Sequence, residues 1–170
     1  MKTATTRNPA AQSVRPARTL GPEDGPIRSI LVPIDFSPPS AQALKYAAVL
    51  AKQCGAKLTL LNVVEPVATP DFAYYPLMME NDKVIAAAKQ RLDRVTKTGK
   101  IRADLIDRTL VRNGAAFHEI ATAAESLKAD LIVIATHGYT GLSHVLLGST
   151  AERVVRHARC PVLVVRARKE

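Results

Sequence analysis

The residues with the clearest chemical potential lie between positions 130 and 150. An apolar run, Leu131 to Ala135, ends in a polar turn that contains Gly138, and nine residues later come Gly148, Ser149 and Thr150. We interpret this as a strand, a glycine-bearing loop and the start of a helix. That order lets backbone N–H groups point at an anion, and phosphate oxygens are natural ligands there. The spacing predicts a phosphate-binding loop.

The same segment also has a purely structural interpretation. Ser149 and Glu152 match a capping box, in which Ser149 caps the helix and Glu152 returns the hydrogen bond. On spacing alone we weigh the two interpretations about evenly. Both can hold, because a capped helix keeps further amides available.

Two polar residues near this loop have equally open roles. Asp35 directly follows the first apolar run, where a carboxylate can accept hydrogen bonds from ribose hydroxyls. Its alternative role is in helix capping, through the turn from Asp35 to Ser37. His137 can contact a phosphate, but a lone loop histidine more often sits in a solvated turn.

Several catalytic motifs are missing from the sequence. It has no G-x-x-x-x-G-K-[ST] loop, so no lysine is placed for phosphoryl transfer, and no G-x-G-x-x-G follows the first strand. The stretch from Gly141 fails the G-x-S-x-G pattern because Val145 replaces the last glycine. These absences favour a binding protein over an enzyme, with a slow ATPase as the lesser alternative.

The composition excludes several partners. Aromatic residues make up 4% of the 170 residues and tryptophan is absent, which argues against a stacking platform for single-stranded nucleic acid. The net charge of +9 is spread along the chain, so nucleic-acid binding rests on charge alone and is disfavoured. No apolar window is long enough to span a bilayer, so we expect no membrane partner.

The two cysteines, Cys54 and Cys160, lack the spacing of a metal site. We expect both to be small buried apolar residues, and they fit a reducing, cytoplasmic compartment.

Apolar runs and helical patterns alternate along residues 28–168, which we take as a single domain after a disordered extension over 1–27. Ser37 and Gly55 are expected to bound the first helix, and residues 65–79 are expected to form a long loop. The alternation predicts an α/β fold with a parallel sheet and right-handed crossovers. Its strands are predicted over 29–34, 57–64, 104–111, 131–135 and 161–165.

Residues 28–166 resemble the universal stress protein (UspA-type) family. Four segments carry the resemblance: Ile30–Ser37, Leu60–Val63, the pair His137-Gly138 with Gly148-Ser149 nine residues later, and Ala151–His157 leading into Cys160–Val165. The family's nucleotide-binding pattern is Gly, two residues, Gly, nine residues, then Gly-Ser/Thr. Gly138, Gly148 and Ser149 match it, whereas Ala135 replaces the first glycine.

The resemblance implies an open five-stranded parallel sheet of order 3-2-1-4-5 with helices on both faces, the adenine nucleotide alpha hydrolase-like fold. It implies adenine and ribose near the first two strands, the α-phosphate near the fourth, and the phosphates at the last helix. We expect the methyl group of Ala135 where the backbone approaches the nucleotide. The candidate binding residues are Pro33, Ile34, Asp35, Val63, Ile134, Ala135, His137, Gly138, Gly148, Ser149 and Thr150.

The function that the resemblance implies is binding of ATP, or of AMP or ADP, with or without Mg²⁺, in a regulatory or protective stress role. Occupancy would change the loop 136–147 or a homodimer that pairs the last strand, 161–165, across a two-fold axis. An apolar edge strand invites such pairing. Two alternatives stay open: a nucleotide-independent interaction protein of the same fold, and a slow ATPase.

Overall fold

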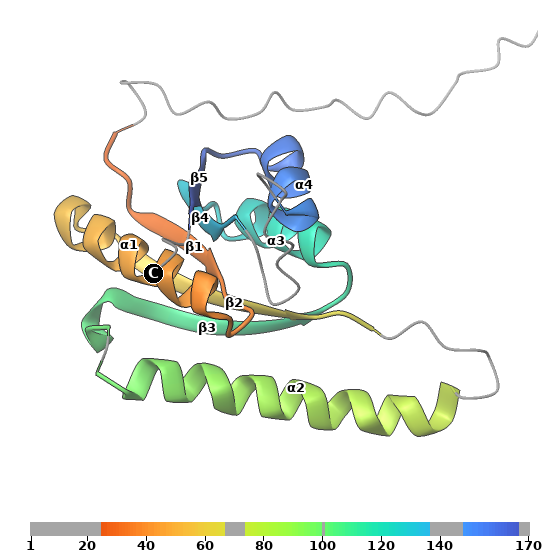
Figure 1. The fold of residues 1–170 in the computed structure, drawn as a ribbon. Helices are drawn as coiled ribbons and strands as arrows, with labels where there is room; N and C mark the ends of the chain where they lie inside the picture. The colour runs from red at the N-terminus through yellow and green to blue at the C-terminus, as the bar shows by residue number, and fades with distance from the viewer. Residues whose placement is uncertain (1–24, 67–73, 100, 137–147, 167–170) are drawn as a thin grey trace, which may run out of the picture.

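The computed structural model describes residues 25–66, 74–99, 101–136 and 148–166 (Figure 1). Side chains between 74 and 81 are not part of this description. The expected extension falls almost wholly outside the described residues, as do His137 and Gly138. Ile27 already packs against the core, one residue before the expected start of the domain.

A five-stranded sheet of order β3-β2-β1-β4-β5 forms the centre of the molecule, and all its neighbouring strands are parallel. This confirms the predicted fold class and order. Because β1 lies in the middle, the chain first builds the sheet toward β3 and then crosses back to β4. The strands are β1 (Ser29–Pro33), β2 (Lys57–Val64), β3 (Ile106–Asn113), β4 (Leu131–Ala135) and β5 (Val162–Val165).

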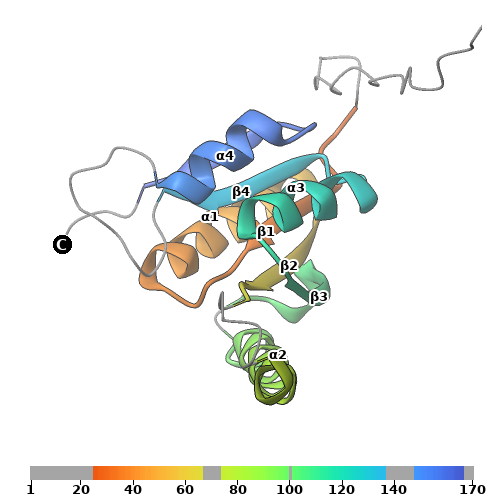
Figure 2. The same ribbon diagram turned by 90° about the vertical axis from the view of Figure 1, so that its right-hand side faces the viewer.

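Helices cover both faces of the sheet (Figures 1 and 2). One face carries α1 (Pro38–Cys54) and α2 (Tyr74–Lys97), and the other carries α3 (Ala116–Ser126) and α4 (Ser149–His157). No helix in the described parts of the chain is both long and apolar enough to cross a membrane.

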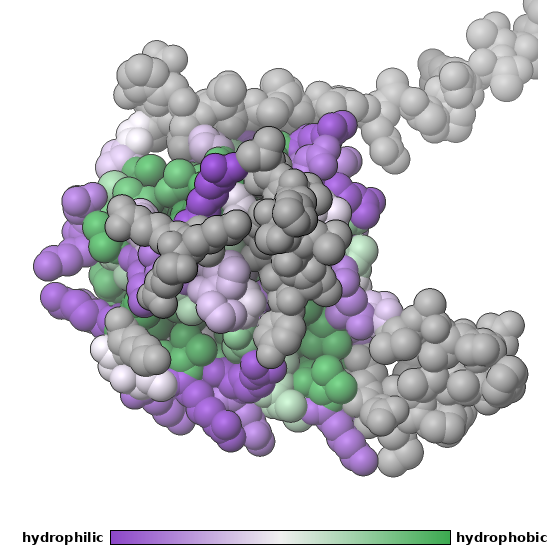
Figure 3. All heavy atoms as spheres, in the orientation of Figure 1, coloured by the Kyte–Doolittle hydropathy of each residue, from purple (hydrophilic) through white to green (hydrophobic). Residues whose placement is uncertain are grey.

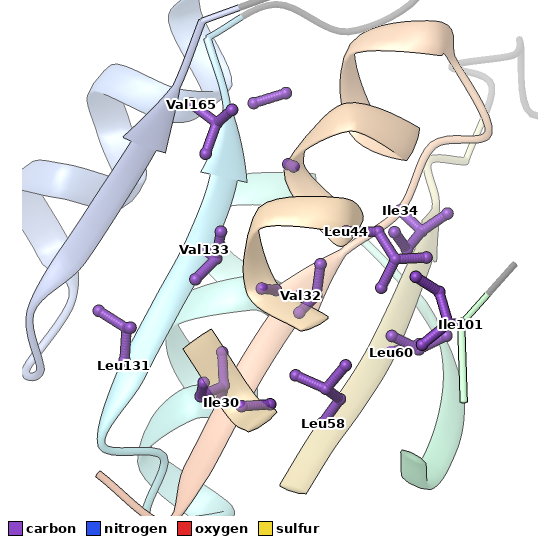
Figure 4. Packing of buried hydrophobic residues seen from close by; sticks show 14 of the residues in the cluster. Ile30, Val32, Ile34, Leu44, Leu58, Leu60, Ile101, Leu131, Val133 and Val165 are labelled. Carbon is purple, nitrogen blue, oxygen red and sulfur yellow. The ribbon is translucent and has the colours of Figure 1, made fainter. Parts of the chain in front are cut away.

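Each face of the sheet has its own hydrophobic cluster because successive strand residues point to opposite sides. In β1, Ile30 and Val32 face α1, whereas Leu31 between them faces α3 and α4. Figure 4 shows the α1 side, where residues of β1, β2 and β4 gather beneath the helix. The nearly continuous burial of β1, β2 and β4 is typical of parallel strands covered on both faces.

Both predicted ends of α1 are confirmed. The Oγ of Ser37 accepts a hydrogen bond from the N–H of Ser40 at 3.2 Å, and proline occupies the first helical position, where no N–H is needed. Gly55 ends the helix in the left-handed conformation at φ 68°.

Some predicted boundaries are wrong. The loop predicted over 65–79 is shorter, because α2 already begins at Tyr74 and takes Pro76 into its first turn, where a missing N–H costs nothing. β3 begins at Ile106 rather than 104, because Ala103–Leu105 form a 3₁₀ turn. The first and last strands are each one residue shorter than predicted, ending at Pro33 and beginning at Val162.

The prediction for the two cysteines is half correct. Cys54 is exposed, because the buried side of α1 is made by Ala43, Leu44, Ala47 and Ala51 instead. Cys160 packs against the cluster beneath α3 and α4, and burial raises the pKa of its thiol to about 11. Cys160 is partly buried and therefore packs as the small apolar residue that was expected, without being fully enclosed.

Candidate functional site

The candidate site lies at the carboxyl edge of the sheet, between β1 and β4. These two strands are hydrogen-bonded neighbours, so the order of the sheet reverses between them as the prediction requires. Ligands of open α/β sheets bind at such a reversal, because the loops that follow the two strands diverge there. The structure thus places the ends of β1 and β4, at Pro33 and Ala135, on neighbouring strands.

Backbone and side-chain bonds fix the end of β1. The N–H of Ile34 donates to the carbonyl of Leu61 at 2.7 Å, and the amide of Asn62 donates to the carbonyl of Ile34 at 2.7 Å. Asn62 is only 7% exposed, so this bond satisfies a buried polar group. Sequence reasoning gave Asn62 no role, although an amide in an otherwise apolar strand was a usable signal.

Asp35 lies directly after this fixed segment and is exposed. Its Oδ1 accepts hydrogen bonds from the N–H of Ser37 at 3.0 Å and from the Ser37 hydroxyl at 2.6 Å. The turn from Asp35 to Ser37, one of its two predicted roles, is therefore confirmed. Because an ionised carboxylate accepts about four hydrogen bonds, this turn is compatible with a ligand role as well.

The start of α4 differs from the predicted capping box. Gly148 is the N-cap residue (φ −68°, ψ 151°), with no side-chain bond to the helix, and Ser149 is already the first helical residue. The carboxylate of Glu152 instead accepts a bond from Arg156 at 2.8 Å. The capping-box interpretation is wrong because the helix starts one residue earlier than it requires, so that Gly148 and not Ser149 is the N-cap.

Hydrogen bonds attach this helix start to the end of β4. The N–H of Gly148 donates to the carbonyl of Thr136 at 2.8 Å, and the N–H of Thr136 donates to Val165 at 3.0 Å. Ser149 and Thr150 follow as exposed residues in the first turn. The backbone N–H groups of this turn are therefore held at the edge of the sheet.

Two other helices that begin at this edge have side-chain caps. Ser37 caps α1, and the carboxylate of Glu65, directly after β2, accepts the N–H of Ala116 at 2.8 Å at the start of α3. The N-cap residue of α3, Ala115, contributes no side-chain bond itself. Sequence reasoning missed Glu65, whose one signal is its place directly after a strand.

The remaining candidate residues divide between the two faces of the sheet. Val63 and Ile134 pack on the face of α3 and α4, and Pro33 shares that face by alternation with Val32. Ile34 and Ala135 pack against the α1 side. Ala135 is 7% exposed, so its methyl group belongs to the packed core under α1 rather than to the face where α4 begins.

A separate hollow of about 600 Å³ lies at the opposite edge of the sheet, where α2 ends and β3 begins. Two of its cations are already paired, Arg102 with Asp104 at 2.8 Å and Arg108 with Asp107 at 2.6 Å. The hydrogen bond from Arg102 lowers the pKa of Asp104. The carboxyl end of a helix disfavours anions, so this hollow is poorly suited to phosphates.

No group of three or more histidine, cysteine, aspartate or glutamate side chains within the described ranges is placed to hold a metal ion. The polar groups of the candidate site are instead backbone amides, the hydroxyls of Ser149 and Thr150, and one exposed carboxylate. This set suits a phosphorylated, hydroxyl-bearing ligand better than a protein-bound cation.

Comparison with known proteins places the chain in a family. Residues 26–166 match the model of the universal stress protein family. Universal stress protein MJ0531 of Methanocaldococcus jannaschii is 36% identical over 151 residues, which cover 84% of each chain. A universal stress protein of Thermus aquaticus is 35% identical over 141 residues, covering 82% of this chain and 98% of the relative.

Comparison with solved structures leads to the same family. UspA of Lactobacillus plantarum superposes with a TM-score of 0.74 at 29% identity, covering 84% of this chain and 100% of the other. A universal stress protein crystallised in complex with cAMP has a TM-score of 0.54 at 25% identity, covering 83% and 98%. The sheet order, the match over nearly all described residues and these relatives together show that the chain belongs to the universal stress protein family, with the adenine nucleotide alpha hydrolase-like fold.

Proposed function

We propose that this chain binds an adenine nucleotide across the β1–β4 edge, with its phosphates on the first amides of α4. The observation that carries the proposal is the start of that helix. Gly148 provides no side-chain cap, and the first turn is anchored to the end of β4 through Thr136. A helix start of this kind presents N–H donors and the positive end of the helix dipole, both of which stabilise phosphate oxygens.

The surroundings of α4 support the same ligand. The exposed carboxylate of Asp35 is the proposed acceptor for ribose hydroxyls. The hydrogen bonds around Ile34 hold the backbone next to Asp35 in place before a ligand binds. Pro33 and Val63 are the proposed neighbours of adenine, on the face where α4 begins. Because the methyl group of Ala135 packs under α1, it does not extend onto that face. His137 and Gly138 remain proposed contacts by resemblance alone.

A relative crystallised with cAMP supports the adenylate class of ligand. Within that class we propose ATP, ADP or AMP, with or without Mg²⁺, and a regulatory or protective role in stress. The chain lacks a phosphate-binding lysine motif, which favours binding over catalysis. The free thiols of Cys54 and Cys160 fit the proposed cytoplasmic location, because thiols persist in reducing compartments.

Titration calorimetry of the purified chain with ATP, AMP and cAMP tests the proposal, with GTP as the control and each titration run with and without Mg²⁺. We expect saturable heat from at least one adenylate and weaker or no binding of GTP. The same adenylate should raise the melting temperature, because a ligand of the native state stabilises it. Flat titrations together with an unchanged melting temperature would favour the nucleotide-independent interaction protein.

We also propose a homodimer through β5, which forms one edge of the sheet. Leu163 on this strand is 38% exposed, and an apolar edge strand favours pairing with a second copy. On the face that Figure 3 shows, hydrophobic residues lie among hydrophilic ones. Light scattering should give a dimer for the wild type and a monomer for Leu163→Asp, and a monomeric wild type would contradict the proposal.

A further inference from the structure

The turn after β1 contains a residue in an unusual backbone conformation. Phe36 has φ 65°, in the left-handed region, where large L side chains are rare. Such a conformation persists only where the surrounding structure holds it, and it occurs most often near functional sites. What holds Phe36 in place therefore matters for the neighbouring residue, Asp35.

A side chain of α2 contacts the ring of Phe36. The guanidinium carbon of Arg91 lies 4.0 Å from the ring centroid, within the range of a cation–π interaction. Phe36 also packs against the core cluster under α1 and α2. The ring thus has an apolar contact with the core and a cationic contact with an otherwise exposed arginine.

The conformation of Phe36 determines where the Asp35 carboxylate points. The hydrogen bond from the N–H of Ser37 to Oδ1 of Asp35 spans Phe36, so it forms only when the chain reverses at that residue. On the other side of Asp35 the backbone is already fixed by the bond from Asn62. The backbone conformation of Phe36 therefore sets the turn in which Ser37 holds this carboxylate.

We propose that Arg91 is a positioning residue for ribose recognition: it holds the Phe36 ring, and through that ring it fixes the turn that orients Asp35. The inference rests on the proposed nucleotide site. It adds that α2, which contributes none of the candidate binding residues, is linked to that site. Because linkage is reciprocal, a ribose-bearing ligand should in turn stabilise the packing of α2.

The test compares two ligands, ATP and 2′,3′-dideoxy-ATP, which lacks both ribose hydroxyls. Calorimetry on the full chain gives the affinities of the wild type, Arg91→Ala and Phe36→Leu, and Arg94→Ala, another exposed arginine of α2, is the matched control. We expect Arg91→Ala and Phe36→Leu to weaken ATP roughly two- to fivefold, the range of one surface cation–π contact. Neither should change the affinity for the dideoxy ligand, and Arg94→Ala should leave both affinities unchanged.

Three results would overturn the inference: unchanged ATP affinity in Arg91→Ala, an equal loss for both ligands, or a wild type that binds the two equally well. An equal loss would mean that Arg91 only stabilises the fold. A wild type that binds neither ligand would overturn the proposed function itself, which separates the two failures. Hydrogen exchange provides a second readout, because ATP should protect amides of α2 in the wild type more than in Arg91→Ala.

Discussion

α3 and α4 begin at the same edge of the sheet and pack side by side on the same face, yet their first turns are completed differently (Figure 2). A carboxylate from a distant residue, Glu65, accepts an N–H at the start of α3. At the start of α4 the N-cap is Gly148, which has no side chain to do so. Among the residues that the structure describes, the start of α3 is thus closed by a carboxylate, whereas we propose that the start of α4 receives a ligand.

The contrast explains why the phosphate site is proposed at α4. An anion at the start of α3 would compete with the carboxylate that is already bound there, whereas at α4 it would complete an unfinished cap. The same physical need of a helix N-terminus is thus met by an internal carboxylate in one case and by the proposed ligand in the other. Variants that change the first turn of one helix at a time therefore test this contrast.

The largest effect is expected from Gly148→Asp. Gly148 has ordinary β-region dihedrals, and aspartate is a favoured N-cap residue, so the variant should fold. The new carboxylate would accept hydrogen bonds from the first N–H groups of α4 and would repel phosphate. We therefore expect calorimetry to show a loss of nucleotide affinity of about tenfold or more. Ala115→Asp places the same residue at the N-cap of α3 and should leave the affinity unchanged. Equal losses in both variants would refute the distinction between the two helices.

A second prediction concerns the cap of α3. Glu65→Ala removes the acceptor of the Ala116 N–H and should lower the free energy of unfolding in urea by about 1 kcal/mol. Glu65→Gln keeps an acceptor oxygen and should recover most of that loss. Nucleotide affinity should change less than about twofold in either variant, well below the loss of about tenfold expected for Gly148→Asp. A loss of nucleotide binding comparable to that of Gly148→Asp would mean that α3 also contributes to the site.

The smallest effect is expected at Ala135. Because its methyl group packs under α1, Ala135→Gly should leave nucleotide affinity within about twofold of the wild type. The free energy of unfolding should fall by about 0.5–1 kcal/mol, the usual cost of glycine within a strand. A marked gain in affinity would show that the methyl group does hinder the ligand, contrary to its position in the structure.

The sequence predicted the arrangement of the sheet well because that arrangement depends on strong signals. Apolar runs alternate with helical patterns, and the resemblance supplied the strand order that the structure confirms. Ser37 and Gly55 marked the ends of α1 correctly because their caps involve residues three or four positions away. Local chemistry of this kind can be inferred from the sequence alone.

The finer details of the site depended on contacts that the sequence does not display. Glu65 caps a helix that begins 51 residues later, and Asn62 donates to a carbonyl 28 residues earlier, so neither role follows from local spacing. The capping box failed by a single residue, because tertiary bonds to Thr136 decide where α4 begins. The contact between Arg91 and Phe36 likewise exists only once α2 has packed.

The most direct test of the account follows backbone amides by NMR while AMP or ATP is added to the ¹⁵N-labelled chain. We expect the largest shifts at Gly148, Ser149 and Thr150, where the phosphates should bind, and small ones at Ala116 and Phe117, where Glu65 completes the helix. Shifts centred on the start of α3, or on the hollow beside Arg108, or no shifts at saturating nucleotide, would contradict the claim that α4 is the phosphate-binding helix.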